Sequence, residues 1–176
     1  MFIGRSQIAH GWALAQRGEV EAAIAQIREG LVACGQTGSR MGETFYTALL
    51  AEVHLSTGQI EDAKVAIGQA KDFVEATNER WMEADIYRLE GDIILCDSPN
   101  LVDEARSCYA RALKVAESKQ ARSLELRAAT SLARLLQNQG ERQAAADVLA
   151  PIYGWFTEGF GTADLKKAKL LLDELV

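Results

Sequence analysis

Small and bulky apolar residues follow one another along the chain in a pattern that returns about every 40 residues. Three segments line up directly: GEVEAAIAQI from Gly18, GQIEDAKVAI from Gly58 and GERQAAADVL from Gly140. A fourth, NLVDEARSCY, begins at Asn100 with its glycine replaced. The alanine five residues after each start recurs at spacings of 40, 42 and 40: Ala23, Ala63, Ala105 and Ala145. Self-similarity at a fixed period of this length is typical of a repeat protein.

Each repeat is predicted to be a pair of helices. A helical stretch upstream of each segment contains one small residue, at spacings of 40, 40 and 42: Gly11, Ala51, Gly91 and Ala133. Small residues let two helices approach closely, and bulkier residues fill the space between the pairs: Ile27, Ile67, Tyr109 and Leu149. Gly18, Gly58 and Gly140 stand where the first helix must end and the chain reverse, which glycine allows without steric cost.

The pattern predicts an all-α fold, a solenoid of four helix pairs with a C-terminal capping helix. We expect one domain, 1–176, with repeats at about 3–37, 38–78, 79–119 and 120–156. Its paired helices are expected at 3–17, 19–35, 40–57, 60–77, 79–96, 101–118, 121–139 and 141–154. The two extra residues of the longer spacing belong to the loop around Pro99, because proline disfavours helix in the residue before it.

The capping helix is expected at 162–175, after Thr162 as its N-cap. Its apolar residues share one side and its charged residues the other. The apolar stripe is Leu165, Ala168, Leu172 and Leu175, and the charged residues are Lys166, Lys169 and Asp173.

Composition and charge exclude several functional classes. With 48 % hydrophobic residues and only two prolines, the chain has the apolar content to bury a core and favours helix over sheet. The net charge of −6 and the interleaved signs argue against a nucleic-acid partner. No signal peptide or membrane-spanning stretch is found, so we expect a soluble protein with no membrane partner. Three cysteines without paired spacing suit the cytoplasm: Cys34, Cys96 and Cys108.

The helix pair resembles the tetratricopeptide repeat (TPR). The resemblance lies in the small residue of the first helix, the turn glycine, and the alanine followed four positions later by a bulky apolar residue. The period of about 40 exceeds the usual 34. The longer unit looks like the variant found in large bacterial signalling proteins. Four segments resemble the C-terminal repeat region of multidomain proteins that join a class III nucleotide cyclase domain to an NTPase module. They are AHGWALAQRGEVEAAIAQI, ERWMEADIYRLEGDIIL, ARSLELRAATSLARLL and LAPIYGWFTEGFGTADLKKAKLLLDEL.

This resemblance implies a regulatory or sensing arm, since the cyclase and NTPase chemistry of such proteins lies in other domains. The opening residues read as mid-helix sequence, so we expect one domain of a larger polypeptide or a short related reading frame. GQTGSRMG from Gly35 places Arg40 and Met41 where a phosphate-binding loop needs its Gly-Lys-Ser/Thr ending, so we interpret it as an inter-repeat loop.

If the array coils into a TPR-like superhelix, the first helix of each pair lines a concave surface. Helical phase puts twelve residues on that side: Arg5, Trp12, Gln16, Phe45, Glu52, Asp85, Arg88, Asp92, Arg127, Thr130, Arg134 and Asn138. The arginines suit a carboxylate or phosphate, and Trp12 and Phe45 suit apolar anchors. The alternative is a solvated face on which Arg88 and Arg134 pair locally with Asp85, Asp92 or Glu90. The family's peptide-carboxylate clamp uses asparagine at a site occupied here by Trp12, Glu52, Asp92 and Arg134, which puts a terminal-carboxylate clamp in doubt.

Other chemistry-bearing residues favour structural roles. His10 and His54 lie in different repeats, so packing or groove roles are favoured over a metal or acid/base pair. Cys96 and Cys108 flank one loop, and buried structural thiols are favoured over a redox pair. Four aromatic residues follow Pro151, which is expected to end or kink the eighth helix, and they form either a local core or an exposed patch for self-association or domain docking. They are Tyr153, Trp155, Phe156 and Phe160.

The sequence therefore predicts a non-catalytic scaffold that binds a protein or peptide, with no cofactor, metal or catalytic residue. One alternative is a small-molecule sensor with a pocket near Trp81 and Trp12. Another is a homo-oligomerisation module, since the first helix has no cap before it and leaves apolar surface for a second copy.

Overall fold

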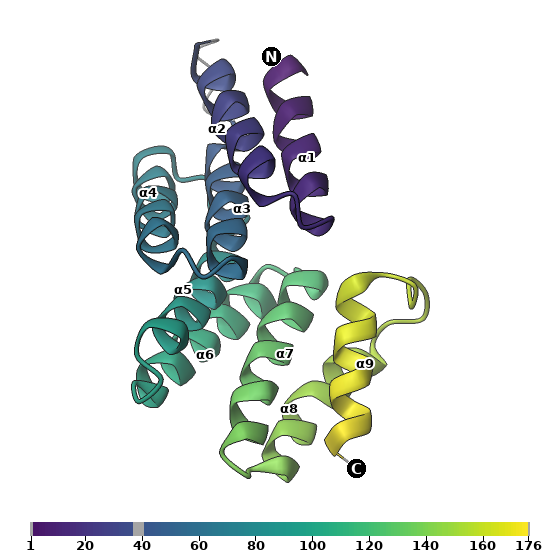
Figure 1. Ribbon diagram of the computed structural model, residues 1–176. Helices are drawn as coiled ribbons and strands as arrows, with labels where there is room; N and C mark the ends of the chain where they lie inside the picture. The colour runs from purple at the N-terminus through teal and green to yellow at the C-terminus, as the bar shows by residue number, and fades with distance from the viewer. Residues whose placement is uncertain (1, 37–40, 176) are drawn as a thin grey trace. The chain divides into compact units, whose positions relative to one another are not determined.

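The computed structural model describes residues 2–36 and 41–175 and consists, over these ranges, of nine helices and no strand (Figure 1). The helices are α1 (Phe2–Gln16), α2 (Val20–Gln36), α3 (Glu43–Ser56), α4 (Ile60–Thr77), α5 (Glu83–Asp97), α6 (Val102–Ser118), α7 (Arg122–Asn138), α8 (Arg142–Gly154) and α9 (Ala163–Leu175). The predicted all-α fold of four helix pairs and a capping helix is confirmed. Over the same ranges, no helix is long and apolar enough to cross a membrane.

The chain divides into two compact units, Met1–Met82 and Glu83–Val176. The first unit holds α1 to α4 and the second α5 to α9. The division falls near the start of the third predicted repeat, 79–119. The single domain 1–176 and the coiling of the whole array stay predictions.

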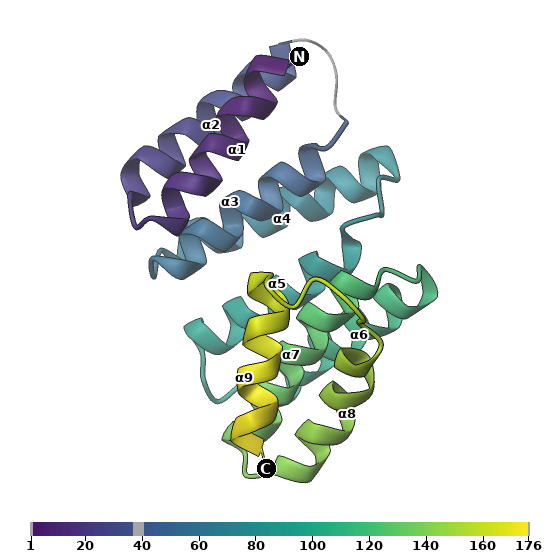
Figure 2. The ribbon, with the colours of Figure 1, turned by 90° about the vertical axis from the view of Figure 1, so that its right-hand side faces the viewer.

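In the first unit, α1 lies beside α2 and α3 beside α4, each pair joined by a short turn (Figure 2). The small residues set how closely α1 and α2 approach. A Cβ added to Gly11 would lie 2.7 Å from the carbonyl oxygen of Ala23, and one on Gly4 would lie 2.7 Å from that of Gly30. The predicted close crossing at Gly11 is therefore present, and the sequence pattern missed a second one at Gly4 and Gly30.

Gly30→Ala is expected to destabilise the first unit by about 1–3 kcal/mol. The added Cβ would lie 2.5 Å from the carbonyl oxygen of Gly4 and 2.6 Å from Cγ1 of Ile8, so the two helices must move apart. Gly68→Ala is the matched control, because Gly68 lies within α4 with open space around its Cα. Urea denaturation should show Gly68→Ala to be more stable than wild type by about 0.5–1 kcal/mol. Equal stability of the two variants would contradict the close crossing.

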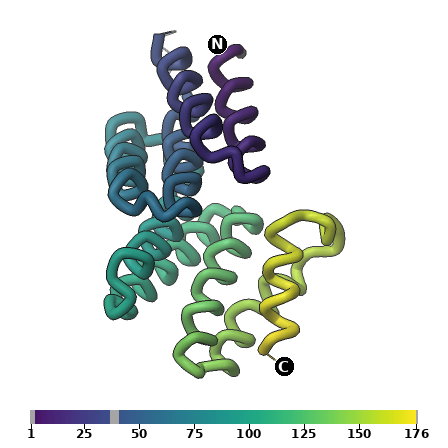
Figure 3. Tube along the Cα trace, in the orientation of Figure 1, coloured from purple at the N-terminus to yellow at the C-terminus, as the bar shows by residue number. Residues whose placement is uncertain are grey.

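In the second unit, one core cluster joins α6, α7, α8 and α9. The ring of Tyr109 on α6 lies against Gly91 on α5, where an added Cβ would be only 2.6 Å from the ring. The four repeat alanines and four bulky residues of the sequence pattern are all buried across the two units: Ala23, Ala63, Ala105, Ala145, Ile27, Ile67, Tyr109 and Leu149. After an arc formed by residues 155–162, α9 lies against α7 and α8 (Figure 3). This placement agrees with the predicted capping role.

The turns explain where the helices end. Gly18, Gly58 and Gly140 all have positive φ, between 75° and 81°, which confirms the predicted reversals. The fifth helix begins at Glu83 and not at residue 79 as predicted, because Asn78 takes the left-handed conformation at φ 57° and ends α4. The third helix begins at Glu43, and its predicted start at residue 40 lies outside the described ranges.

The last two helices test two further predictions. α8 runs from Arg142 to Gly154, close to the predicted 141–154, and contains Pro151, so of the two effects expected of the proline the helix end is not observed. In α9, Leu171, which the predicted stripe leaves out, is fully buried, and Leu172, which it includes, is half-buried, because α7 and α8 contact the helix from two sides and widen its apolar stripe. Thr162 directly precedes α9 as expected, and its carbonyl accepts a hydrogen bond from the Lys166 N–H.

Candidate functional site

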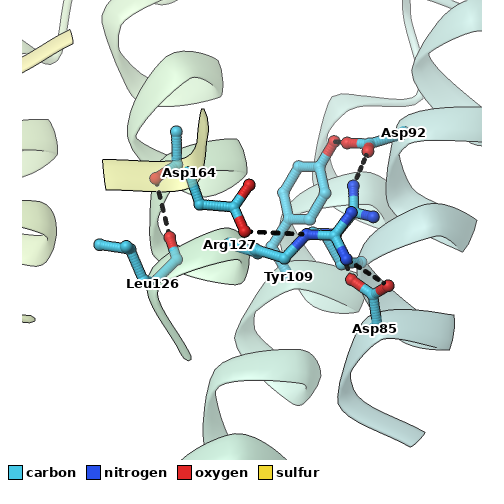
Figure 4. A network of polar contacts seen from close by, with 8 residues as sticks. Asp85, Asp92, Tyr109, Leu126, Arg127 and Asp164 are labelled. Atoms are coloured by element: carbon cyan, nitrogen blue, oxygen red, sulfur yellow. Dashed lines mark hydrogen bonds and ion pairs between the residues drawn. The ribbon is translucent and has the colours of Figure 1, made fainter. Parts of the chain in front are cut away.

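Three predicted binding-face residues on α5, Asp85, Arg88 and Asp92, form a hydrogen-bonded group, and Figure 4 labels the two aspartates. Arg88 Nε donates to Asp85 Oδ1 at 2.6 Å, and Arg88 Nη1 donates to Asp92 Oδ2 at 2.6 Å. Their spacing of three and four residues places them on one side of the helix. Asp85 and Arg88 are buried, and Asp92 is half-buried. The alternative interpretation, that Arg88 pairs locally, is confirmed.

Side chains from three further helices extend this group. The Tyr109 hydroxyl on α6 donates to Asp92 Oδ1 at 2.7 Å, and Arg127 Nη1 on α7 donates to Asp85 Oδ2 at 2.9 Å. Figure 4 shows Arg127 between Asp85 and Asp164, whose carboxylate on α9 lies 4.0 Å from Arg127 Nε. The network therefore links α5, α6, α7 and α9 within the second unit.

Arg134 pairs with α9. Its Nη1 donates to Glu174 Oε2 at 2.5 Å, and Gln137 Nε2 donates to the same oxygen at 3.2 Å. These bonds lower the pKa of Glu174, with the Gln137 contribution the largest. Arg134 also donates to Gln137 Oε1. The predicted pairing of Arg134 with Asp85, Asp92 or Glu90 is wrong, because α9 brings a closer carboxylate that helical phase alone does not reveal.

The network predicts a stability loss at alkaline pH. Burial raises the pKa of the Tyr109 phenol well above its ordinary value, and the Asp92 carboxylate raises it further. The unfolded chain releases this proton near pH 10, so above that pH the unfolded state binds fewer protons than the folded state and stability falls as pH rises. We expect wild type to lose stability more steeply than Tyr109→Phe between about pH 9 and 11. Urea denaturation at several pH values measures both slopes, and equal slopes would contradict the prediction.

In the first unit, the predicted binding-face residues are exposed or half-buried. Trp12 is 42 % exposed, while Arg5, Phe45 and Glu52 are half-buried. The Phe45 ring lies 5.4 Å from the Trp81 ring, centroid to centroid. Trp81 is 50 % exposed, although the sequence suggested it only for a small-molecule pocket. Trp12 and Trp81 thus offer partly exposed apolar surface on this unit.

The start of α3 is held by a residue that sequence reasoning missed. Glu79, in the connection after α4, accepts a hydrogen bond from the Gly42 N–H at 2.8 Å. Gly42 has φ 85° and no side chain to cap the helix, so the carboxylate of Glu79 takes that role at the positive end of α3. This bond fixes the Trp81 connection to the start of α3, beside Phe45.

The remaining candidates lie apart from these groups. His54 is buried and its Nδ1 lies 2.5 Å from Gln59 Oε1, a packing role, whereas His10 is exposed. Cys34 is buried, but Cys108 is half-buried and Cys96 is exposed, so buried structural thiols are the wrong interpretation for the last two. Partial desolvation and Asp92 raise the pKa of Cys96, which disfavours the thiolate that redox exchange requires.

The aromatic residues after Pro151 divide between the two predicted roles. Tyr153 and Phe156 pack against the core of the second unit. Trp155 and Phe160 are 57 % and 48 % exposed, and the Arg122 guanidinium lies 5.4 Å from the Trp155 ring. The local core and the exposed patch are therefore both present, each made by two of the four residues.

Comparison with solved structures shows the fold class. The chain is similar to a crystal structure from Podosopora anserina, whose description names a kinesin light chain with nearly identical TPR-like repeats. The TM-score is 0.66 and the sequence identity between this chain and that structure is 18 %. A crystal structure of a variant of the same repeats gives a TM-score of 0.67 at 18 % identity. Each match covers 97 % of this chain and 84 % of the other. No family model and no curated protein matches the chain. The fold is TPR-like.

Proposed function

We propose that this chain is a non-catalytic interaction module that binds a protein or peptide through its first unit, at the first helices of its pairs and the connection that carries Trp81. One observation carries the proposal: Trp12 and Trp81 are about half exposed, and Phe45 lies against Trp81. Tryptophan is enriched among residues that dominate binding energy, because it buries a large area with few rotatable bonds.

The predicted arginines of the second unit support the choice of the first. Arg88, Arg127 and Arg134 each donate to side chains of their own unit, and Arg88 is buried between two carboxylates. A partner must displace those contacts before it can use these donors. Charge reversal of Arg88 would therefore test folding and not binding.

Affinity capture from a lysate of the source organism tests the proposal. We expect proteins enriched by wild type to be lost with the double variant Trp12→Ala, Trp81→Ala. Trp155→Ala is the matched control, because Trp155 is a tryptophan of the other unit that is at least as exposed. Circular dichroism should show wild-type helix content for all three. Retained capture by the double variant would contradict the proposed surface.

The finer assignment rests on the sequence resemblance. We propose that the module is a regulatory or sensing arm of a bacterial signalling protein with a class III nucleotide cyclase or NTPase domain, acting in the cytoplasm. Co-purification of the chain with such a domain, lost in the double tryptophan variant, would support it. A homodimer and a small-molecule effector near Trp81 remain predictions, checked by light scattering and by ligand-dependent shifts in melting temperature.

A further inference from the structure

The corner between α1 and the start of α3 contains an arginine without a carboxylate partner among the residues that the structure describes. This corner comprises Arg5, Met41, Gly42, Phe45 and Trp81. The only hydrogen bond of Arg5 in these ranges runs from Nη2 to the carbonyl oxygen of Met41, at a long 3.5 Å. Arg88, Arg127 and Arg134, the other arginines of the predicted binding face, all pair with carboxylates.

One carboxylate at the corner, that of Glu79, holds the start of α3 through Oε1, and its Oε2 is buried with no hydrogen-bond partner among the described residues. Glu79 binds the Gly42 N–H, which belongs to the same peptide group as the Met41 carbonyl. The N–H and the carbonyl of a trans peptide point in opposite directions, so Arg5 and Glu79 approach this group from opposite sides. Glu79 serves α3 as its cap, which leaves the guanidinium of Arg5 with donors for an external acceptor.

Apolar surface lies directly beside this cation. Met41, whose carbonyl Arg5 approaches, is 69 % exposed. Tyr46 follows at the start of α3, where a Cβ on Gly42 would be 2.9 Å from its ring, and its ring lies 5.5 Å from that of Phe45. Phe45 in turn contacts Trp81. The half-buried guanidinium of Arg5 presents hydrogen-bond donors next to exposed apolar side chains. The corner therefore matches a ligand that carries an anionic hydrogen-bond acceptor and an apolar group.

We infer that this corner binds a peptide segment in which an aspartate or glutamate side chain stands next to an apolar one. The inference rests on the proposed function and names its partner class. The carboxylate accepts two parallel hydrogen bonds from Arg5, and the apolar neighbour covers Met41 and Trp81. A basic segment would be repelled by Arg5, and a purely apolar one would leave the guanidinium partly desolvated without a counter-charge.

Selection from a random 12-residue peptide library displayed on phage tests this inference. We expect wild type to enrich acidic residues beside apolar ones, and Arg5→Glu to lose that preference and enrich lysine or arginine. Arg28→Glu is the control, since it changes the net charge equally at an exposed site on α2. Unchanged acidic enrichment with Arg5→Glu, or none with wild type, would overturn the inference.

Affinity of one selected peptide, synthesised with an amidated C-terminus, gives the second measurement. Amidation removes the terminal carboxylate, so binding then depends on the acidic side chain. We expect Arg5→Gln to weaken binding by about 10- to 100-fold, as loss of a charged hydrogen-bond partner does. Peptides that need Trp81 but are indifferent to Arg5→Gln would sink this inference alone. If no peptide binds and capture is unaffected by the tryptophan variants, the proposed function fails as well.

Discussion

Arg88→Ala is expected to lower the free energy of unfolding of the second unit by about 3–5 kcal/mol. The substitution removes the cation that donates to both Asp85 and Asp92 and leaves a buried carboxylate with less compensation. Urea denaturation followed by circular dichroism measures the loss, and hydrogen exchange of α5 to α7 assigns it to this unit.

Arg134→Ala is the matched control for Arg88. Arg134 also pairs with a carboxylate, but its side chain is 46 % exposed and that of Glu174 is 49 % exposed. Water screens such a pair, so we expect a loss of no more than about 1 kcal/mol. An equal loss of unfolding free energy in both variants would contradict the prediction that the buried Asp85–Arg88–Asp92 group stabilises the unit more than the exposed Arg134–Glu174 pair does.

Leu171→Ala is expected to cost about 2–5 kcal/mol and to loosen α9 from α7 and α8. The side chain is fully buried in the cluster that joins α6 to α9, and truncation leaves a cavity there. Leu170→Ala, one residue earlier and 62 % exposed, should change stability by less than about 0.5 kcal/mol.

The sequence stripe supplies a third variant in the same helix. It assigned Leu172 to the buried side, whereas the structure leaves this residue half-buried. Urea denaturation should therefore rank the losses as Leu171, then Leu172, then Leu170. A larger loss for Leu172 than for Leu171 would show that α9 is rotated from the orientation described here.

The repeat made most of the fold predictable. A pair of helices must place a small residue wherever the axes come close, so Gly11 and Gly91 mark the crossings in the sequence as clearly as in the structure. The turn glycines are informative for a similar reason, because positive φ is cheap only for glycine. The small residues at the crossings and the glycines at the turns are both local features, so they can be recognised within one repeat.

Helix ends depend on less specific residues. Asn78 ends α4 in the left-handed conformation, a role for which asparagine is allowed but not required, so the delayed start of α5 was not apparent. Pro151 does not end α8, whose last residue is the predicted one. It lies in the last turn of α8, where few residues remain beyond it, and the helix continues through it to Gly154.

The candidate site shows what helical phase omits. Phase correctly groups Asp85, Arg88 and Asp92 on one side of α5, yet it cannot say whether a third helix covers that side. Arg127 and Arg134 pair with the α9 carboxylates of Asp164 and Glu174, which lie 37 and 40 residues away in sequence. Trp81 was not placed on the binding face, because it belongs to a connection and has no helical phase.

The exposure of all three tryptophans decides which optical signal suits which experiment. Trp12, Trp81 and Trp155 already meet water in the folded chain, so their emission should shift little towards the red on unfolding. Intrinsic fluorescence will therefore be a weak reporter of denaturation for this protein. The same property makes intrinsic fluorescence a sensitive reporter of association. A partner that excludes water from Trp12 or Trp81 should shift the emission to the blue, while the emission of the unbound protein stays almost constant.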